Sequence, residues 1–305
     1  MEYHTSVLLE EALDFLRVRA GGRYIDCTLG DGGHAVEMLR LGARVLGMDI
    51  NEVALARATQ RVEDLGLSSL FVGVCGSFAD VEAIANRFGF GRADGILYDL
   101  GTSSFQLLDG GLGLSFKKDE PLDMRLDKNL SVTAADLVNA LSEAQLKKLF
   151  TDFGEERYAG KFAKAICARR SLKKFNSAKD LAELVAEEAS PGYEKGRIHP
   201  ATRVFLALRI AVNDELANLF ISLPRAARLL APPERELSLP GGRMVIITFH
   251  SLEDRLVKEF GRGSRLQKIA AGVLPQRDEV TRNVRARSAK MHVFERMNEQ
   301  TNHSL

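Results

Sequence analysis

The glycine-rich segment DCTLGDGGHA (26–35) and the carboxylate of Asp49 have the types and spacing of a nucleoside-binding site. The segment stands between an apolar run, which predicts a strand, and an amphipathic run, which predicts a helix. Glycines here allow a tight turn and a close approach of the backbone to a ligand. Asp49 comes 19 residues after Gly30, a spacing at which a carboxylate binds the ribose hydroxyls of an adenosine-type cofactor. Gly30, Gly32 and Ala35 also complete the pattern G-x-G-x-x-A, so NAD and S-adenosylmethionine both remain open.

Asp99 and His250 are further candidates, because each ends a predicted strand, 93–101 and 241–251. The carboxyl ends of parallel strands line the ligand crevice of an open α/β sheet. We therefore expect both side chains near Asp49. The alternative for Asp99 is a turn-capping role.

The elements that must position these residues follow an alternating pattern. Four short apolar runs predict strands, at 23–29, 43–50, 69–75 and 93–101. An amphipathic, helical run follows each of the first three, which predicts βαβ units and a parallel sheet. Gly42, Gly66 and Gly89 close these helical runs, as glycines after a helix do.

The alternation stops after the fourth strand and resumes near Asp214 with a helical run and the strands 241–251 and 291–297. Between them lie turn-rich and helical stretches, in which Thr133, Ser142 and Ser177 occupy expected helix N-cap positions. The pattern predicts an α/β, Rossmann-like domain formed by residues 1–104 and 213–305, interrupted by an inserted, mainly helical domain at 105–212.

Composition narrows the class of protein. The chain has 305 residues with a net charge of +1, and no apolar stretch reaches about 18 residues, so we expect no membrane span. The amino terminus lacks the features of a secretory signal. The three cysteines are far apart and predict neither disulfides nor a metal site, and the histidines show no ligand spacing. We expect a cytoplasmic protein without a bound metal.

Charge is unevenly distributed along the chain. Residues 1–110 hold 16 acidic and 9 basic residues, whereas residues 255–296 hold 11 basic and 4 acidic ones. A basic block within 161–175 has no acidic residue; it comprises Lys161, Lys164, Arg169, Arg170, Lys173 and Lys174. Such a block indicates either a phosphate-binding surface or a solvated helix face.

Blocks along nearly the whole chain are similar to those of one methyltransferase family. They run from HTSVLLEEAL (4–13) to RSAKMHVFER (287–296) and include DCTLGDGGHA, GMDINEVALA, DGILYDLGTSSFQL, PLDMRLD, FGEERYAGKFAKAI, IHPATRVFLALRIAVNDEL and GGRMVIITFHSLEDRLVK. On these motifs the chain resembles the RsmH (MraW-like) ribosomal RNA small-subunit methyltransferases. The resemblance implies N4-methylation of a specific cytidine in the decoding region of 16S rRNA, with S-adenosylmethionine as cofactor and the small ribosomal subunit as partner.

The resemblance also implies site residues. Gly32, Gly33 and His34 are expected at the methionine and sulfonium end of the cofactor, and Asp49 at the ribose hydroxyls. Phe78 is expected beside the adenine, although its type and position alone favour the core. Asp99 and Gln106 are expected to complete the pocket.

The chemistry sets its own requirement. The cytosine N4 amine is a poor nucleophile, and methyl transfer needs a proton acceptor as positive charge develops on nitrogen. Asp99 is our leading acceptor, and His250 is a second catalytic candidate. The alternative for His250 and Ser251 is that they bind the base or a phosphate. Phe105, Phe116 and Tyr158 are candidates for stacking on the target base, with ordinary packing as the alternative.

Two other classes of function compete with this interpretation. An NAD-type oxidoreductase on the same fold accounts for the glycine loop and Asp49 but leaves the basic block unexplained. A non-catalytic RNA-binding or assembly protein accounts for the basic block, but intact Asp26, Gly30, Asp49 and Asp99 argue against it.

Overall fold

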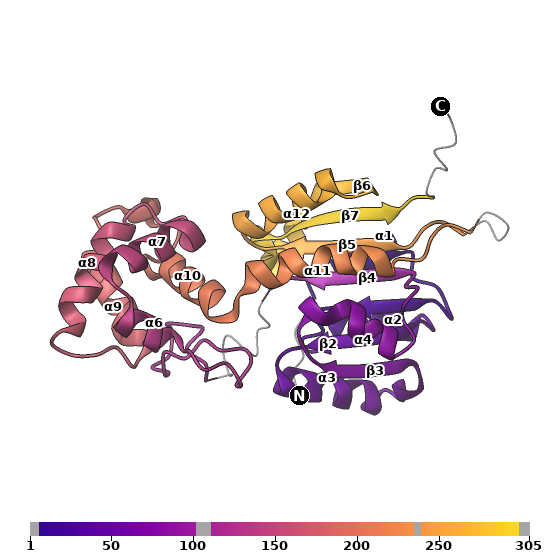
Figure 1. Ribbon diagram of the computed structural model, residues 1–305, viewed down its shortest axis with the longest axis horizontal. Coiled ribbons are helices and arrows are strands. Elements are labelled where there is room, and N and C mark those ends of the chain that lie inside the picture. Colours follow the sequence, from indigo (N-terminus) through magenta and orange to yellow (C-terminus); the bar gives the residue numbers. More distant parts are fainter. Residues whose placement is uncertain (1–5, 102–110, 235–238, 299–305) are drawn as a thin grey trace. The chain divides into compact units, whose positions relative to one another are not determined.

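The computed structural model describes residues 6–101, 111–234 and 239–298, and the chain divides into two compact units. Unit 1 comprises Met1–Ser103 and Leu216–Leu305, and unit 2 comprises Ser104–Glu215 (Figure 1). Among the described residues, no helix combines the length and apolarity needed to cross a bilayer.

Unit 1 is built on a seven-stranded sheet in the order β3-β2-β1-β4-β5-β7-β6. The strands are β1 (Arg23–Asp26), β2 (Arg44–Asp49), β3 (Phe71–Cys75), β4 (Gly95–Asp99), β5 (Arg243–Thr248), β6 (Leu266–Val273) and β7 (Lys290–Arg296). The first five strands pair in parallel, whereas β7 runs antiparallel to both β5 and β6. The sheet confirms the predicted α/β, Rossmann-like fold.

Helices cover both faces of this sheet (Figure 1). They are α1 (Leu9–Leu16), α2 (Gly33–Arg40), α3 (Glu52–Asp64), α4 (Val81–Arg87), α11 (Glu215–Leu229), α12 (Ser251–Gly263) and α13 (Arg277–Arg282), with short 3-10 turns η1 (Ser68–Leu70), η2 (Phe78–Asp80) and η4 (Val284–Ser288). Apolar side chains from α1, α2 and α3 form one core with the sheet, and those from α4, α11 and α12 form a second. Strands buried on both sides explain why the sequence shows continuous apolar runs there.

The helix ends follow the sequence signals. Gly42, Gly66 and Gly89 have φ values of +79°, +71° and +77°, the left-handed conformation expected of glycines after a helix. Asn51 caps α3, since its side chain accepts hydrogen bonds from the N–H groups of Val53 and Ala54. A cap of this kind is worth about 1 kcal/mol and fixes the helix start directly after β2.

Unit 2 is helical in its described part. Its helices are α6 (Ala134–Ala140), α7 (Glu143–Gly154), α8 (Ala159–Arg170), α9 (Ala178–Glu188) and α10 (Ala201–Asn213), with the 3-10 turn η3 (Tyr193–Gly196). Thr133 and Ser142 form capping boxes and Ser177 caps α9, so all three N-cap predictions are confirmed. The helices share one core, to which Phe150 and Phe162 contribute fully buried rings. The role predicted for residues 105–212, substrate recognition, stays a prediction.

Candidate active site

The glycine-rich loop between β1 and α2 is packed so closely that two positions admit only glycine without rearrangement. Gly32 has a φ of +74°, and a Cβ there would lie 3.2 Å from the Ala58 Cβ. A Cβ on Gly33 would lie 2.0 Å from the Oγ of Ser6. The loop therefore packs tightly against Ser6 and Ala58 at the start of α2, and the first N–H groups of a helix are the ones that have no partner within the helix and can bind a ligand.

Asp49, at the end of β2, holds this loop by a hydrogen bond. Its Oδ2 accepts a hydrogen bond of 2.8 Å from the Gly30 N–H, and its Oδ1 accepts one of 2.8 Å from the Asn51 N–H. Each carboxylate oxygen has a second lone pair, so both remain able to accept from a ligand hydroxyl. The geometry fits the ribose-binding role expected of Asp49 and adds a structural one.

Three carboxyl groups stand at the ends of three neighbouring parallel strands. Asp26 of β1 is in register with Gly47 of β2 and Leu97 of β4, so Asp49 and Asp99 each end two residues beyond it. Burial, as the main cause, raises the pKa of Asp26 to about 7, of Asp49 to about 6 and of Asp99 to about 8. Raised carboxyl pKa values mean that negative charge is poorly compensated at this end of the sheet, called the crevice below, so Asp26, Asp49 and Asp99 favour a ligand that brings positive charge.

Asp99 is held by its backbone and has one side-chain oxygen to spare. Its N–H donates to the Thr28 Oγ1 at 2.6 Å, which ties β4 to the loop after β1. Its Oδ1 is buried, and no described residue hydrogen-bonds to it. Its Oδ2 lies 3.8 Å from the Nδ1 of His34, a ring that is 4% exposed. A buried oxygen without a partner costs free energy unless a ligand group fills the place.

Comparison with known proteins identifies the family to which this chain belongs. A family model described as the MraW methylase family matches residues 1–297. A protein of Carboxydothermus hydrogenoformans is 43% identical over 97% of this chain and 99% of its own length. Relatives from Nostoc punctiforme and Thermomicrobium roseum are 42% and 43% identical, each over 96% of this chain and 94% of the relative. All three are named ribosomal RNA small subunit methyltransferase H.

The chain belongs to the MraW methylase family. As a methylase of this family it has S-adenosylmethionine for a cofactor, and the crevice fits that molecule on structural grounds. The Oδ1 of Asp99, to which no described residue hydrogen-bonds, and the neighbouring buried carboxyls suit a cationic ligand. Gly32, Gly33, His34, Asp49 and Asp99 would hold it.

Phe78, expected beside the adenine, lies in this methylase at the start of η2, just beyond β3. Its ring packs edge-on against Tyr98, with centroids 5.8 Å apart, and its carbonyl oxygen accepts a hydrogen bond from the Ser222 Oγ at 2.7 Å. The ring is partly buried beside the end of β4, and its contact with adenine stays a prediction.

The strand pattern predicts that His250 ends the strand 241–251, but β5 ends at Thr248, so His250 lies two residues beyond the strand and is the N-cap of α12. Its Nδ1 accepts from the Glu253 N–H at 3.4 Å. Its Nε2 lies 3.0 Å from the Glu253 Oε1, although the angle is not that of a hydrogen bond. Both ring nitrogens of His250 therefore lie against Glu253. A catalytic role for His250 would require its ring to turn away from the Glu253 carboxylate.

The remaining aromatic candidates and Gln106 are placed as follows. Gln106 and Phe105 lie outside the described residues. Phe116 stacks on His199, with ring centroids 4.5 Å apart, and Tyr158 packs against the rings of α8 and η3 inside unit 2. For these two rings the structure favours ordinary packing over a base-stacking platform.

The basic block of α8 and the turn after it is paired more fully than the sequence suggests. Lys161 and Arg169 lie 3.6 Å and 3.1 Å from Glu188 and Glu187 of α9, and Lys173 lies 2.9 Å from Asp180. The Arg170 guanidinium donates to the Val138 carbonyl oxygen. The block therefore offers less free positive charge than its composition indicates.

Lys164 and Lys174 differ from the rest of the block. Both are exposed, and neither has an ion pair or hydrogen bond within the described part of the chain. These two amines are the members of the block that are available to a phosphate.

Sequence reasoning missed two charged groups beside the crevice. Asp31, in the glycine loop, is 7% exposed and pairs with Arg57 of α3, whose Nε lies 2.9 Å from its Oδ1. Arg285 of η4 acts on Asp99 as a nearby positive charge that lowers its pKa against the larger effect of burial. Neither residue follows a local spacing rule. The signal available for Arg285 was the block RSAKMHVFER (287–296), which begins two residues after it.

Proposed function

We propose that the chain transfers a methyl group from S-adenosylmethionine to the N4 atom of a cytidine in the decoding region of 16S rRNA. The observation that carries this is the Asp99 carboxyl, which ends β4 and has a buried oxygen to which no described residue hydrogen-bonds. The names of the relatives support rRNA of the small subunit as the substrate.

The cofactor supplies an activated methyl group on a sulfonium. The chain's own residues would bind and orient it: Asp49 would accept from the ribose hydroxyls, and the loop at Gly32 and Gly33 would hold the methionine portion. Because burial lowers the pKa of His34 to about 4, its ring is neutral and does not repel a sulfonium.

Methyl transfer forms an N–C bond, breaks a sulfonium S–C bond and releases one proton from nitrogen. The lone pair of the cytosine amine is delocalised into the ring, so positioning must supply much of the rate. Asp99 would accept a hydrogen bond from the amine and so localise its lone pair on nitrogen. As positive charge develops on nitrogen, the carboxylate would stabilise it and accept the released proton. With a pKa raised to about 8, the ionised Asp99 carboxylate is a stronger base than an ordinary one, and the positive charge of a bound sulfonium would favour that ionised form over the protonated form of the free protein.

Substrate binding needs positive charge outside the acidic crevice. Lys164 and Lys174 of unit 2 are exposed and unpaired within the described residues, and α13 and η4 contribute the exposed Arg277, Arg282 and Arg287 to unit 1. We assign RNA contacts to both sets, with residues 105–212 as the substrate-recognition domain. A cytoplasmic location follows from the ribosomal substrate.

A dinucleotide-dependent oxidoreductase fits the crevice less well. Its diphosphate would bring negative charge to a loop flanked by Asp26, Asp49 and Asp99, and Arg57 already pairs with Asp31. A purely RNA-binding role does not explain why a buried oxygen of Asp99 has no hydrogen-bond partner among the described residues.

Purified chain and small ribosomal subunits from a strain that lacks it provide the test. With methyl-labelled S-adenosylmethionine, nucleoside mass spectrometry should find the label on N4 of cytidine in 16S rRNA. Naked 16S rRNA in a parallel reaction shows which form is the substrate. Label on another atom or in the large-subunit rRNA would refute the proposal.

A further inference from the structure

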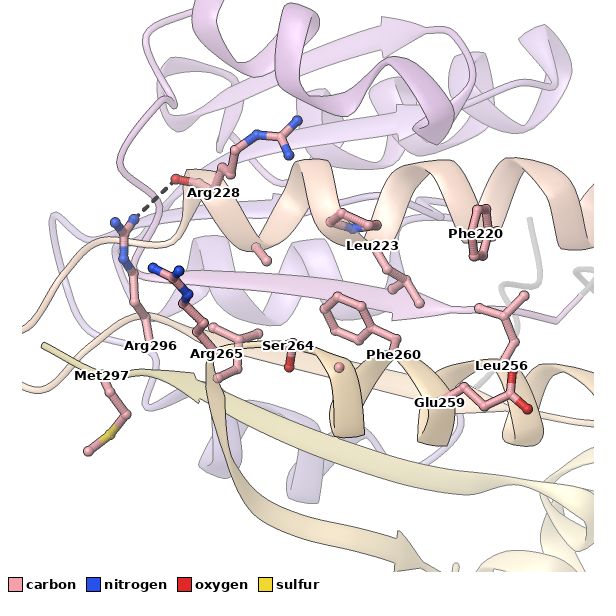
Figure 2. Close-up of a pocket in the computed structure, with 14 residues that line it drawn as sticks. Phe220, Leu223, Arg228, Leu256, Glu259, Phe260, Ser264, Arg265, Arg296 and Met297 are labelled. Atoms are coloured by element: carbon pink, nitrogen blue, oxygen red, sulfur yellow. Dashed lines mark hydrogen bonds between the residues drawn. The ribbon is translucent and has the colours of Figure 1, made fainter. Parts of the chain in front are cut away.

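An open groove of about 500 Å³ lies between α11 and α12, on the sheet face that α4 also covers. Leu223 and Phe260 give it an apolar floor (Figure 2), and Leu266 also lines it. Gly261 lets α12 approach β7 here, since a Cβ on it would lie 2.4 Å from the Phe294 ring. The groove has the size of a binding site.

The rim of the groove exposes large apolar side chains that the fold does not use. Phe220 is 69% exposed and Met297 is 46% exposed, and they come from α11 and from the residue after β7 (Figure 2). Phenylalanine, methionine and arginine are the residue types enriched where proteins bind each other. Large apolar side chains exposed on a rim suit a macromolecular partner more than an enclosed small ligand.

Charge gives the groove a direction. Arg228, Arg265 and Arg296 gather at one end (Figure 2). Arg228 pairs with Glu82, and Arg296 donates to the carbonyl oxygens of Arg228 and Leu230. Arg265 is exposed and has no hydrogen bond or ion pair within the described part of the chain, so a guanidinium is free to bind a carboxylate.

The arginine end is remote from the cofactor crevice. Arg296 follows Glu295, which pairs with Arg243 at the start of β5, whereas Asp99 pairs with Ile247 near the end of that strand. Four residues of strand separate the two levels by about 13 Å. An occupant at this end leaves the crevice open.

We propose that the groove docks a short segment of a partner protein, with apolar side chains along one face and an aspartate or glutamate at the end that meets Arg265. The apolar floor and the two exposed rim side chains bind the apolar face, as a groove between helices binds an amphipathic helix. The unpaired guanidinium fixes the orientation of the segment. This inference is independent of the methyl-transfer reaction.

The test is selection of a random 16-residue peptide display library on the immobilised full chain. Recovered peptides should have apolar residues at helical spacing and an acidic residue at one end. Their dissociation constants, measured by fluorescence anisotropy, should rise about tenfold or more in Arg265→Glu and in Phe220→Asp. Changing the acidic residue of the peptide to lysine should restore its binding to Arg265→Glu.

Matched controls keep the result specific. Arg44→Glu reverses an exposed arginine at the start of β2, and Leu172→Asp changes a side chain that is 87% exposed in unit 2. Both should bind the peptides as the parent does, and all four variants should bind S-adenosylmethionine normally, which shows that they fold. Recovery of no peptide, of peptides without acidic residues, or of peptides insensitive to the groove variants would overturn the proposal. Recovery of no peptide together with binding of decanoate that Phe220→Asp weakens would assign the groove to a small amphiphile instead.

Discussion

The Nδ1 of His34 lies 3.8 Å from the Oδ2 of Asp99, while its Nε2 lies 3.2 Å from the carbonyl oxygen of Val7. A carbonyl oxygen accepts only, so the proton of the neutral ring is on Nε2. The lone pair of Nδ1 therefore faces the Asp99 carboxyl. This arrangement favours a protonated Asp99 in the free protein, in the same direction as the burial that raises its pKa to about 8.

The raised pKa of Asp99 makes stability depend on pH. Between its ordinary pKa of about 4 and its folded value of about 8, the folded chain holds a proton that the unfolded chain has lost, so its contribution to stability falls as pH rises. Asp99→Asn cannot ionise. Relative to the parent, its free energy of unfolding without cofactor should increase by about 1 kcal/mol or more between about pH 5 and pH 8.

Urea unfolding at several pH values measures this difference. Asp14→Asn, which removes an exposed carboxyl on α1, is the matched control and should lack the stabilisation that is specific to Asp99→Asn. A parent-to-Asp99→Asn difference that stays constant across the range would contradict the raised pKa.

Asp99→Ala should slow methyl transfer about 100-fold or more under single-turnover conditions, with a much smaller change in affinity for the small subunit. The reason is that an acceptor matters most as charge develops on the amine. Rapid-quench measurement of labelled rRNA gives the rate. A single-turnover rate near that of the parent would remove Asp99 from the chemistry.

Asp49→Ala should weaken binding of S-adenosylmethionine about tenfold or more, since hydrogen bonds to a charged group contribute about 1.5–3 kcal/mol each. The loop at Gly30 also loses its acceptor, so thermal stability should fall as well. Calorimetric titration and a melting curve separate the two effects. Affinity equal to the parent's would show that the ribose does not meet this carboxylate.

Much of the cofactor domain could be predicted from the sequence because its signals are local. The apolar runs at 23–29 and 43–50 contain β1 and β2, and the glycine after α2 lies where the pattern predicts it. Asp49 could be singled out because strand, glycine loop and carboxylate follow each other within one βαβ unit.

Other features depend on contacts that no local pattern carries. The strand β6 (Leu266–Val273) was not predicted, because this partly exposed edge strand shows bulges and no strict alternation against β7. The capping role of His250 depends on Glu253, which the strand pattern does not reveal. The pairing of the basic block depends on α9, a separate helix whose acids could not be matched to particular lysines and arginines.

That pairing changes which cations should bind RNA. Lys164→Ala with Lys174→Ala should reduce the salt dependence of small-subunit binding by about 1.4–1.8 in log–log slope, if each amine contacts one phosphate. Binding to S-adenosylmethionine should stay unchanged. The paired Lys161→Ala and Lys173→Ala make the matched control, with a smaller change expected. Equal slopes for the parent and the first double variant would assign the block to a solvated helix face.

Methylation in the cell tests the proposed reaction most directly. Small-subunit rRNA is digested from a strain that lacks the chain, and from the same strain supplied with the parent or with Asp99→Ala at equal protein levels. Mass spectrometry should find N4-methylated cytidine absent in the deletion strain, restored by the parent and strongly reduced with Asp99→Ala. An unchanged amount of N4-methylated cytidine in the deletion strain would contradict the assignment of this chain to that reaction.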